Sequence, residues 1–293
     1  MKNNSSLNKF EKKIYSQFGE DGIVQEIFKR IGEKNSDKWC VEFGARDGIS
    51  DSNTYNLIKN LDYSGVLIEG DKKYFNELKK NIKSDKVIKI NKFVSFEGSN
   101  KLENILQTTK IPKNFDFLSI DIDGCDYHIF EQLELFTPKI ICIEFNHMIP
   151  NEVEFVQSKN FAFKHGSSPK SLVDLAKAKN YHLVANTLTN LFFIHGNIKD
   201  LVLEENISLE NIRNDENIKN LIFSGYDGTL FTTKPIEISW HKIKVENKNF
   251  QILPKYLRKF PGDYNLVNKV FFYIYREFLF PGRFLRKFFK KKN

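Results

Sequence analysis

The amino-acid sequence predicts an α/β fold, in which a mostly parallel, doubly wound sheet is followed by a C-terminal extension that ends in an amphipathic basic helix. Five short apolar segments alternate with segments of helical periodicity, the pattern of an open sheet with parallel strands. These segments are apolar on both faces, as in a sheet that helices cover on both sides. Near the C-terminus, apolar residues recur at helical spacing beside a cluster of basic residues.

The elements of the sheet domain are expected in a regular order. Residues 1–13 are polar and expected to be frayed, and the apolar spacing of residues 23–31 then predicts a helix that stops at Gly32. The strands are expected at 38–43, 65–69, 86–94, 115–120 and 139–145. The helices between them are expected at 51–60, 71–82, 100–107 and 126–133. A long loop follows at 145–166, a further helix at 168–179 and a closing antiparallel hairpin at 181–185 and 191–195.

The composition places the chain among globular intracellular proteins. It has 293 residues, of which 41% are apolar and 28% charged. We divide it into a helical lead-in at 1–36, a sheet domain at 37–196, an extension without an assigned role at 197–263 and a tail at 264–293. No apolar run predicts a transmembrane helix, and the first residues lack the apolar core of a secretory signal. The cysteines, Cys40, Cys125 and Cys142, fall in or beside predicted strands, which favours reduced thiols and a cytoplasmic protein.

Acidic residues follow the first two predicted strands. The first strand runs into Glu42, Gly44 and Gly48, where the glycines permit a tight turn and the close approach of a ligand to the backbone. The glycine fingerprint of dinucleotide sites is absent, and a carboxylate here suits a cationic or hydroxylated ligand. Glu69, after the second strand, is placed to accept ribose hydroxyls, with Asp71 as the cap of the next helix. The alternatives are an ordinary strand-to-helix turn at Gly44 and simple helix capping at Glu69.

Three motifs together resemble the class I S-adenosylmethionine-dependent methyltransferases and, within that class, the FkbM-like group. They are Val-Glu-Phe-Gly-Ala-Arg-Asp-Gly at 41–48, Val-Leu-Ile-Glu-Gly-Asp at 66–71 and Leu-Ser-Ile-Asp-Ile-Asp-Gly-Cys-Asp-Tyr at 118–127. The resemblance covers residues 14–196. The sequence departs from the family pattern at Gly70, where proline is usual, and at Asp123 and Asp126, where glutamates are usual. The resemblance implies a Rossmann-like fold, S-adenosylmethionine as cofactor and methyl transfer to the oxygen of a sugar hydroxyl in a glycan, a lipid-linked saccharide or a secondary metabolite.

The resemblance also implies a role for each strand end. The amino-acid half of the cofactor would lie against three residues of the first motif, Glu42, Gly44 and Gly48. Glu69 would hold the ribose, and Phe93 or Val94, at the end of the third strand, would flank the adenine. Asp121 would lie near the methionine amino group or the transferred methyl group.

Oxygen-bearing side chains also gather at the ends of the fourth and fifth strands. Asp121 and Asp123 are two residues apart, as are Glu144 and Asn146, and strand alternation projects each pair to one side. One interpretation is a Mg²⁺ site with Asp121, Asp123 and Glu144 as ligands, because carboxylate oxygens suit hard cations. A second is that these groups bind substrate hydroxyls and the cofactor ammonium without a metal. A third is that Asp123 or Asp126 simply caps the following helix.

Methyl transfer to a hydroxyl requires alignment of donor and acceptor and removal of the acceptor proton. We expect Asp121, Asp123 and His147 to carry this chemistry, with His147 as the general base just beyond the fifth strand. His128 is a weaker candidate for the same role, and His165 is a candidate for an acceptor-binding lid. The alternative for His147 is an ordinary loop histidine that faces solvent.

The tail combines an apolar stripe over 266–279 with most of the positive charge of the chain. Residues 264–293 hold eight basic residues and one acidic residue, which makes +7 of the total of +8. Basic residues interleaved with bulky aromatic ones favour an anionic membrane surface as the partner of residues 266–292, at the inner face of the membrane. The alternative is that the stripe packs on the main domain or on a second copy in a homo-oligomer. One short terminal cluster disfavours a nucleic acid partner.

Two rival functions remain open on the sequence. One is a non-catalytic, membrane-docked binding or scaffold protein on the same fold, because a fold does not guarantee an activity. The other is a sugar-nucleotide enzyme that uses the same sheet.

Overall fold

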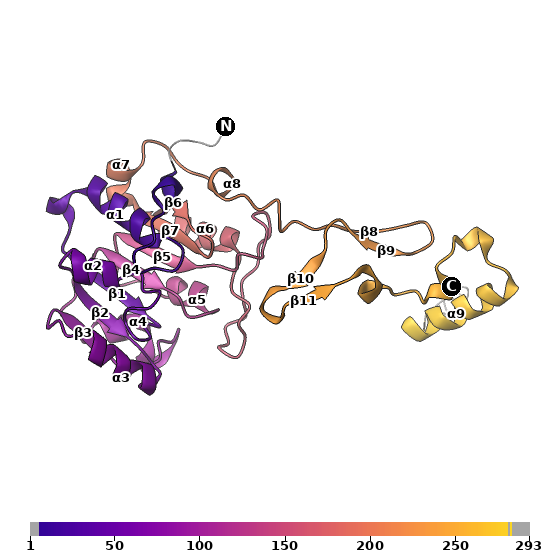
Figure 1. Ribbon diagram of the computed structural model, residues 1–293, viewed down its shortest axis with the longest axis horizontal. Coiled ribbons are helices and arrows are strands. Elements are labelled where there is room, and N and C mark those ends of the chain that lie inside the picture. The colour runs from indigo at the N-terminus through magenta and orange to yellow at the C-terminus, as the bar shows by residue number, and fades with distance from the viewer. Residues whose placement is uncertain (1–5, 281, 283–293) are drawn as a thin grey trace, which may run out of the picture. The chain divides into compact units, whose positions relative to one another are not determined.

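The chain forms two compact units, Met1–Ile218 and Lys219–Asn293 (Figure 1). The computed structural model describes residues 6–280 and Gly282. The predicted basic cluster from Arg283 onward therefore lies outside the described residues, as does Pro281.

A seven-stranded sheet forms the centre of the first unit, with the strand order β3-β2-β1-β4-β5-β7-β6. Strands β1 to β5 are parallel, whereas β7 is antiparallel to both of its neighbours. The strands are β1 (Trp39–Phe43), β2 (Ser64–Ile68), β3 (Val87–Ile90), β4 (Phe117–Ile120), β5 (Ile140–Glu144), β6 (Tyr181–Asn186) and β7 (Asn190–His195). This is a mostly parallel, doubly wound sheet, so the predicted fold class is confirmed.

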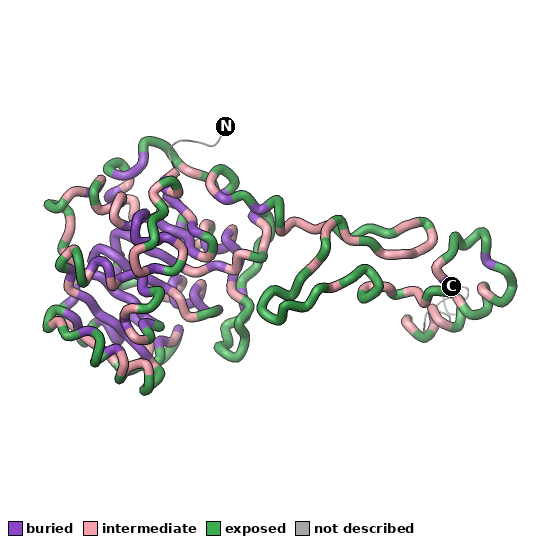
Figure 2. The backbone as a smooth tube through the Cα atoms, viewed as in Figure 1, coloured by how far each residue is buried: buried purple, intermediate pink, exposed green. Residues whose placement is uncertain are grey.

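Helices cover both faces of the sheet. The α-helices of this unit are α1 (Glu20–Ile31), α2 (Tyr55–Asn60), α3 (Lys72–Asn81), α4 (Leu102–Leu106), α5 (Asp126–Glu131), α6 (Pro169–Ala178), α7 (Lys199–Val202) and α8 (Leu209–Ile212). Short 3₁₀ helices lie at η1 (Leu7–Phe10), η2 (Glu33–Asn35), η3 (Gly98–Asn100) and η4 (Gly196–Ile198). Helices α4, α5 and α6 share a core with one face, and α1, α2, α3 and α7 pack on the other. The strands lie between these layers and are buried (Figure 2).

Local sequence signals set several of the boundaries. Asp71 caps α3 by accepting hydrogen bonds from the backbone N–H groups of Lys73 and Tyr74, as expected. Ser168 caps α6 in the same way through Ser171. Gly32 ends α1 with a φ of 77°, a conformation in which glycine is not strained.

Three boundaries differ from the prediction. The helix expected from residue 51 begins at Tyr55, because Asp51 has a φ of 55° and pairs with Ser16. Strand β3 ends at Ile90, because the next side chain, Asn91, donates to the backbone oxygens of Glu69 and Gly70. The N-terminal segment is ordered from η1, where Leu7 is fully buried in the core on the α1 side.

Residues 197–218 belong to the first unit and pack on its sheet. Ile198, Val202 and Leu203 join the core on the α1 side of the sheet, and Leu209 joins the core on the other side. The part of the chain that follows the closing hairpin is therefore held against the sheet by apolar burial.

The second unit is built from short elements. Its strands are β8 (Ile222–Ser224), β9 (Leu230–Thr232), β10 (Ile236–Ile238) and β11 (Ile243–Val245), which pair as two hairpins. Its 3₁₀ helices are η5 (Ser239–His241), η6 (Asn247–Phe250), η7 (Lys255–Leu257) and η8 (Pro261–Asp263). The predicted C-terminal helix is confirmed as α9 (Leu266–Leu279), which Asn265 caps. None of the helices in residues 6–280 has the length and apolar character that crossing a bilayer requires.

A buried ion pair supports the amino ends of β1 and β4. Asp116 is fully buried and accepts from the Lys139 ammonium at 2.9 Å and from the backbone N–H of Trp39 at 3.0 Å. We predict that Asp116→Ala lowers the free energy of unfolding by about 3–5 kcal/mol, because it leaves buried donors without this acceptor. Urea titration measures the loss.

The matched control is Asp62→Asn, which removes the charge of an exposed pair with Lys86 at 2.6 Å and suits the φ of 61° at this position. It should leave the urea midpoint unchanged, because exposed ion pairs contribute little. Equal stability of the two variants would contradict the structural role of Asp116.

Candidate functional site

The topology of the sheet marks one place for a ligand. Chain connections run from β1 outward through β2 to β3, and from β4 outward in the opposite direction to β5. The direction reverses between β1 and β4, which are parallel neighbours with Phe43 opposite Ile120. In open α/β sheets, ligands bind outside the carboxyl ends of the strands at such a reversal. The loops that begin at Gly44 and Asp121 therefore border the candidate site.

Gly44 allows these two loops to approach each other. It has a φ of 69°, and a Cβ atom placed on it would lie 2.6 Å from the backbone oxygen of Asp121. Any larger residue would push the two strand ends apart or strain the turn. The structure therefore brings the predicted site residues Gly44 and Asp121 together.

Gly48 serves a different contact. A Cβ atom on Gly48 would lie 2.4 Å from Leu78 and 2.9 Å from Ile82 at the end of α3. The small size of this residue is therefore required by the packing of the loop on α3.

Glu42 is buried and accepts hydrogen bonds from its own chain. Its carboxylate accepts from the Ser52 hydroxyl at 2.6 Å, the Thr54 hydroxyl at 2.6 Å and the Asn53 backbone N–H at 2.8 Å. Burial raises the pKa of Glu42, and these donors oppose the rise. The Asn53 amide in turn donates to Ser119 on β4 at 3.0 Å. Glu42 thus holds the segment before α2 over the ends of β1 and β4.

Glu69 joins the loops that follow β1 and β2. It is buried, and its two oxygens accept from the backbone N–H groups of Arg46 and Asp71, each at 2.7 Å. Each carboxylate oxygen has room for a further donor. The structure therefore places Glu69 beside the first glycine loop, on the β2 side of the switch point.

The two candidates for the adenine position lie beyond the end of β3. The ring of Phe93 is 69% exposed and packs on Gly70, where a Cβ atom would lie 2.2 Å from it. This contact explains why glycine stands at position 70. Val94 points instead into the core that α4 and α5 share with the sheet.

Three carboxylates meet beyond β4 and β5. Asp121, Asp123 and Glu144 each place an oxygen within 4.8 Å of the others, as the strand-end spacing predicts. Burial, and then the charge of Asp123, raises the pKa of Asp121 to about 6. Burial, and then the charge of Asp121, raises the pKa of Glu144 to about 10. At neutral pH the Asp121–Glu144 pair therefore holds a proton, and a cation at this place would relieve the repulsion.

Asn146 was expected along this crevice and Asp126 as an alternative helix cap, and both side chains bond to loops instead. Asp126 is buried and accepts from the backbone N–H groups of Ile122 and Gly124, which shapes the loop before α5. Burial, and then the charge of Asp121, raises the pKa of Asp126 to about 7. The amide of Asn146 donates to the backbone oxygen of His165 at 2.7 Å, so this side chain is engaged by the loop that follows β5.

Sequence reasoning missed Glu20, at the start of α1. It is fully buried and accepts from Thr187 at 2.7 Å and from Asn190 at 3.1 Å. Asn190 lies opposite Glu144 in the β5–β7 pairing, and the charge of Glu20 contributes to the raised pKa of Asp121. Acidic residues at the start of a helix are common, so the sequence offered no signal that this one reaches the site.

His147 follows β5 and is half-buried. Burial, and then the nearby Arg213 guanidinium, lowers the pKa of His147, so its imidazole is neutral at neutral pH. Arg213 also donates to the backbone oxygen of His147 at 2.8 Å and bonds to Asn151. The turn that carries His147 is therefore held by residues from 197–218, for which the sequence suggested no role.

The long loop after β5 is tied down at Gln157. The buried amide of Gln157 accepts from the backbone N–H groups of His165 and Gly166 and donates to the backbone oxygen of Phe163. Exposed Lys164 pairs with Asp123 at 3.1 Å, so the loop borders the carboxylate group. His128 is buried against the Gln157 backbone oxygen at 2.7 Å, a structural position.

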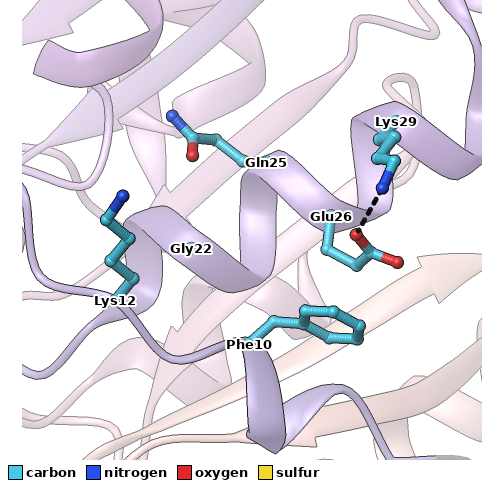
Figure 3. Close-up of a pocket in the computed structure, with 6 residues that line it drawn as sticks. All are labelled: Phe10, Lys12, Gly22, Gln25, Glu26 and Lys29. Atoms are coloured by element: carbon cyan, nitrogen blue, oxygen red, sulfur yellow. Dashed lines mark ion pairs between the residues drawn. The ribbon is translucent and has the colours of Figure 1, made fainter.

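A hollow of about 250 Å³ lies elsewhere on the first unit, between η1 and the outer side of α1 (Figure 3). Its lining residues are Phe10, Lys12, Gly22, Gln25, Glu26 and Lys29. Lys29 and Glu26 form an ion pair across one end, at 3.8 Å. None of the predicted site residues is among them, and the topology places the ligand at the strand ends instead.

No family model and no curated protein matches the chain. Among solved structures, the pyocyanin biosynthetic protein PhzM is 14% identical with a TM-score of 0.35, over 55% of this chain and 51% of PhzM. A SAM-dependent methyltransferase from Aquifex aeolicus is 12% identical with a TM-score of 0.34, over 58% of this chain and 87% of that one. The O-methyltransferase NcsB1, in complex with S-adenosyl-L-homocysteine, is 10% identical with a TM-score of 0.35, over 54% of this chain and 49% of NcsB1. The chain thus spans about half the length of PhzM and of NcsB1.

The carboxyl pair makes stability depend on pH. Asp121 and Glu144 have pKa values above those of the unfolded chain. Their contribution to the free energy of unfolding is therefore full at acidic pH, and it is lost as pH rises through about 6 for Asp121 and about 10 for Glu144. We predict that the free energy of unfolding falls between about pH 6.5 and pH 9, and that Glu144→Gln flattens this fall. Urea titration at both pH values measures it.

Glu154→Gln is the matched control, since Glu154 is exposed on the same loop region and pairs only loosely with Lys170, at 3.6 Å. It should keep the wild-type slope. A wild-type slope in Glu144→Gln would show that Glu144 does not hold the proton.

Proposed function

We propose that this chain is an S-adenosylmethionine-dependent O-methyltransferase of the FkbM-like group that methylates a sugar hydroxyl of a glycan, a lipid-linked saccharide or a secondary metabolite. The observation that carries the proposal is the gathering of carboxylates at the switch point between β1 and β4. A fold alone does not establish an activity, so the argument rests on the charge and placement of these groups.

The proposed cofactor is positively charged, and the carboxylates of Asp121, Asp123 and Glu144 converge at the proposed site. S-adenosylmethionine supplies a methyl group on a sulfonium centre and bears an ammonium group. The half-buried carboxylate of Asp121, with its neighbours Glu144 and Asp123, favours such a cation because charges attract strongly where water is excluded. A sugar nucleotide would instead bring its diphosphate against these carboxylates. This charge argument favours the methyltransferase over a sugar-nucleotide enzyme.

Glu69 is the residue proposed to bind the ribose. It lies at the end of β2, next to the switch point, and its two oxygens each accept one backbone N–H group. Those bonds fix the orientation of the carboxylate and leave lone pairs for two hydroxyl donors. The exposed ring of Phe93, packed on Gly70, offers a flat apolar surface beside it for the adenine.

The acceptor is proposed to lie against the loop that follows β5. This loop carries exposed aromatic rings, among them Phe161 and Phe163, and its Lys164 pairs with Asp123. Phe163 stacks on His165 with 5.3 Å between ring centroids. Flat rings of this kind can pack on the apolar face of a sugar. His147, neutral at physiological pH, is proposed to accept the hydroxyl proton.

The proposal includes a metal ion at the site. The oxygens of Asp121, Asp123 and Glu144 converge within 4.8 Å, and three carboxylates suit a hard cation such as Mg²⁺. The raised pKa values of Asp121 and Glu144 are consistent with a place that favours positive charge. A bound Mg²⁺ would lower the pKa of a coordinated hydroxyl. Methyl transfer measured with and without a chelator tests this part separately.

Cofactor binding tests the proposal without knowledge of the acceptor. We predict that S-adenosylhomocysteine binds the wild-type chain and that Glu69→Gln weakens this binding by about 1–3 kcal/mol, through lost hydrogen bonds to a charged group. Isothermal titration calorimetry measures both affinities. Glu97→Gln, at an exposed position of a nearby loop, is the control and should bind as the wild type does. Absence of saturable binding by the wild type would refute the function itself.

Turnover separates an enzyme from a scaffold. We predict that Asp121→Asn lowers methyl transfer about 100-fold, because it removes charge from the reacting centre. The assay follows label from methyl-labelled S-adenosylmethionine into glycan and lipid-linked saccharide fractions. Asp174→Asn, an exposed carboxylate on α6, should transfer at the wild-type rate. Tight cofactor binding with no transfer to any fraction would favour the non-catalytic scaffold.

A further inference from the structure

Helix α9 exposes an apolar stripe, in which Phe271 also contacts the ring of Tyr256 with 6.0 Å between centroids. The stripe consists of Val267, Val270, Phe271, Ile274 and Phe278, which recur at helical spacing, and each is between 49% and 80% exposed. Figure 2 shows much of this helix as exposed. Large apolar side chains aligned in this way on one side of a helix usually mark an interaction surface.

A neighbouring side of α9 packs on the unit itself. Phe272 contacts the ring of Tyr264 with 5.6 Å between centroids, and the Tyr275 hydroxyl donates to the backbone oxygen of Ile252 at 2.5 Å. Asn268 and Leu279 are half-buried on this same side. Helix α9 therefore contacts its own unit through this side and through Phe271, while the other stripe residues stay exposed.

The positive charge of the C-terminal segment indicates which partner binds the stripe. Residues 264–293 hold eight basic residues and one acidic residue. Two copies of this chain that paired through the stripe would bring these like charges together, which disfavours self-association. An anionic lipid surface accepts both the apolar stripe and the basic residues, since apolar side chains enter the acyl boundary while lysine and arginine stay among the headgroups.

We propose that α9 docks the protein on an anionic membrane surface, with the stripe of Val267, Val270, Phe271, Ile274 and Phe278 buried at the boundary between headgroups and acyl chains. The helix lies along the surface and does not cross the bilayer. This docking is independent of the activity proposed for the first unit, because it uses only residues of the second.

Vesicle sedimentation tests the docking with the full chain. We expect the protein to sediment with phosphatidylcholine vesicles that contain phosphatidylglycerol, and much less with phosphatidylcholine alone. Salt should weaken this binding, because the basic residues are screened. Ile274→Asp should weaken it about tenfold or more, because it places a charge in the centre of the stripe.

Two further variants make the result specific. Tyr226→Asp adds the same charge at a residue that is 94% exposed in the turn between β8 and β9, and it should bind as the wild type does. A chain that ends at Phe280 lacks six basic residues and should lose its preference for anionic vesicles while keeping the stripe.

Three results would overturn the proposal. One is equal binding of the wild type to neutral and anionic vesicles. Another is unchanged binding by Ile274→Asp. The third is concentration-dependent self-association, seen by analytical ultracentrifugation without lipid, that Ile274→Asp abolishes; the stripe would then be an interface between copies of the chain.

Discussion

Negative charge crowded at the carboxyl ends of β4 and β5 is the constraint on which the rest of the site depends. Asp121 and Glu144 are half-buried next to each other, and their pKa values rise to about 6 and about 10 for that reason. Such a pair holds a proton at neutral pH and is stabilised by any cation that replaces it. Gly44 lies directly against the Asp121 backbone, so this charge sits at the topological switch point itself.

The two glutamates at the ends of β1 and β2 differ in what they can still bind. Glu42 accepts three hydrogen bonds from residues 52–54, whereas Glu69 accepts two from backbone groups. A carboxylate has about four acceptor positions. Glu69 therefore retains more capacity for a ligand, and Glu42 is better explained as a positioning residue that holds the segment before α2. The prediction that both contact the cofactor is consequently stronger for Glu69.

The sequence could predict the sheet but only part of the site. Short apolar segments predict the strands. The residues at the ends of these segments include Asp121, Asp123 and Glu144, whose carboxylates converge in the structure. Glu20 and Arg213 could not be found in this way, because their contacts join parts of the chain that are far apart in sequence. Strand β3 was predicted too long, since nothing in the sequence shows that the Asn91 side chain takes over the backbone contacts there.

The contacts of Arg213 extend the candidate site beyond residues 37–196, the predicted sheet domain. Burial lowers the pKa of the His147 imidazole and Arg213 lowers it further, and Arg213 also donates to the His147 backbone oxygen, so this residue contributes to both the position and the protonation state of the proposed base. A fixed cation beside a base disfavours the protonated form and limits how strong the base can be. His147 is therefore suited to a hydroxyl whose pKa is already lowered by its surroundings, which links the proposed base to the proposed cation at Asp121, Asp123 and Glu144.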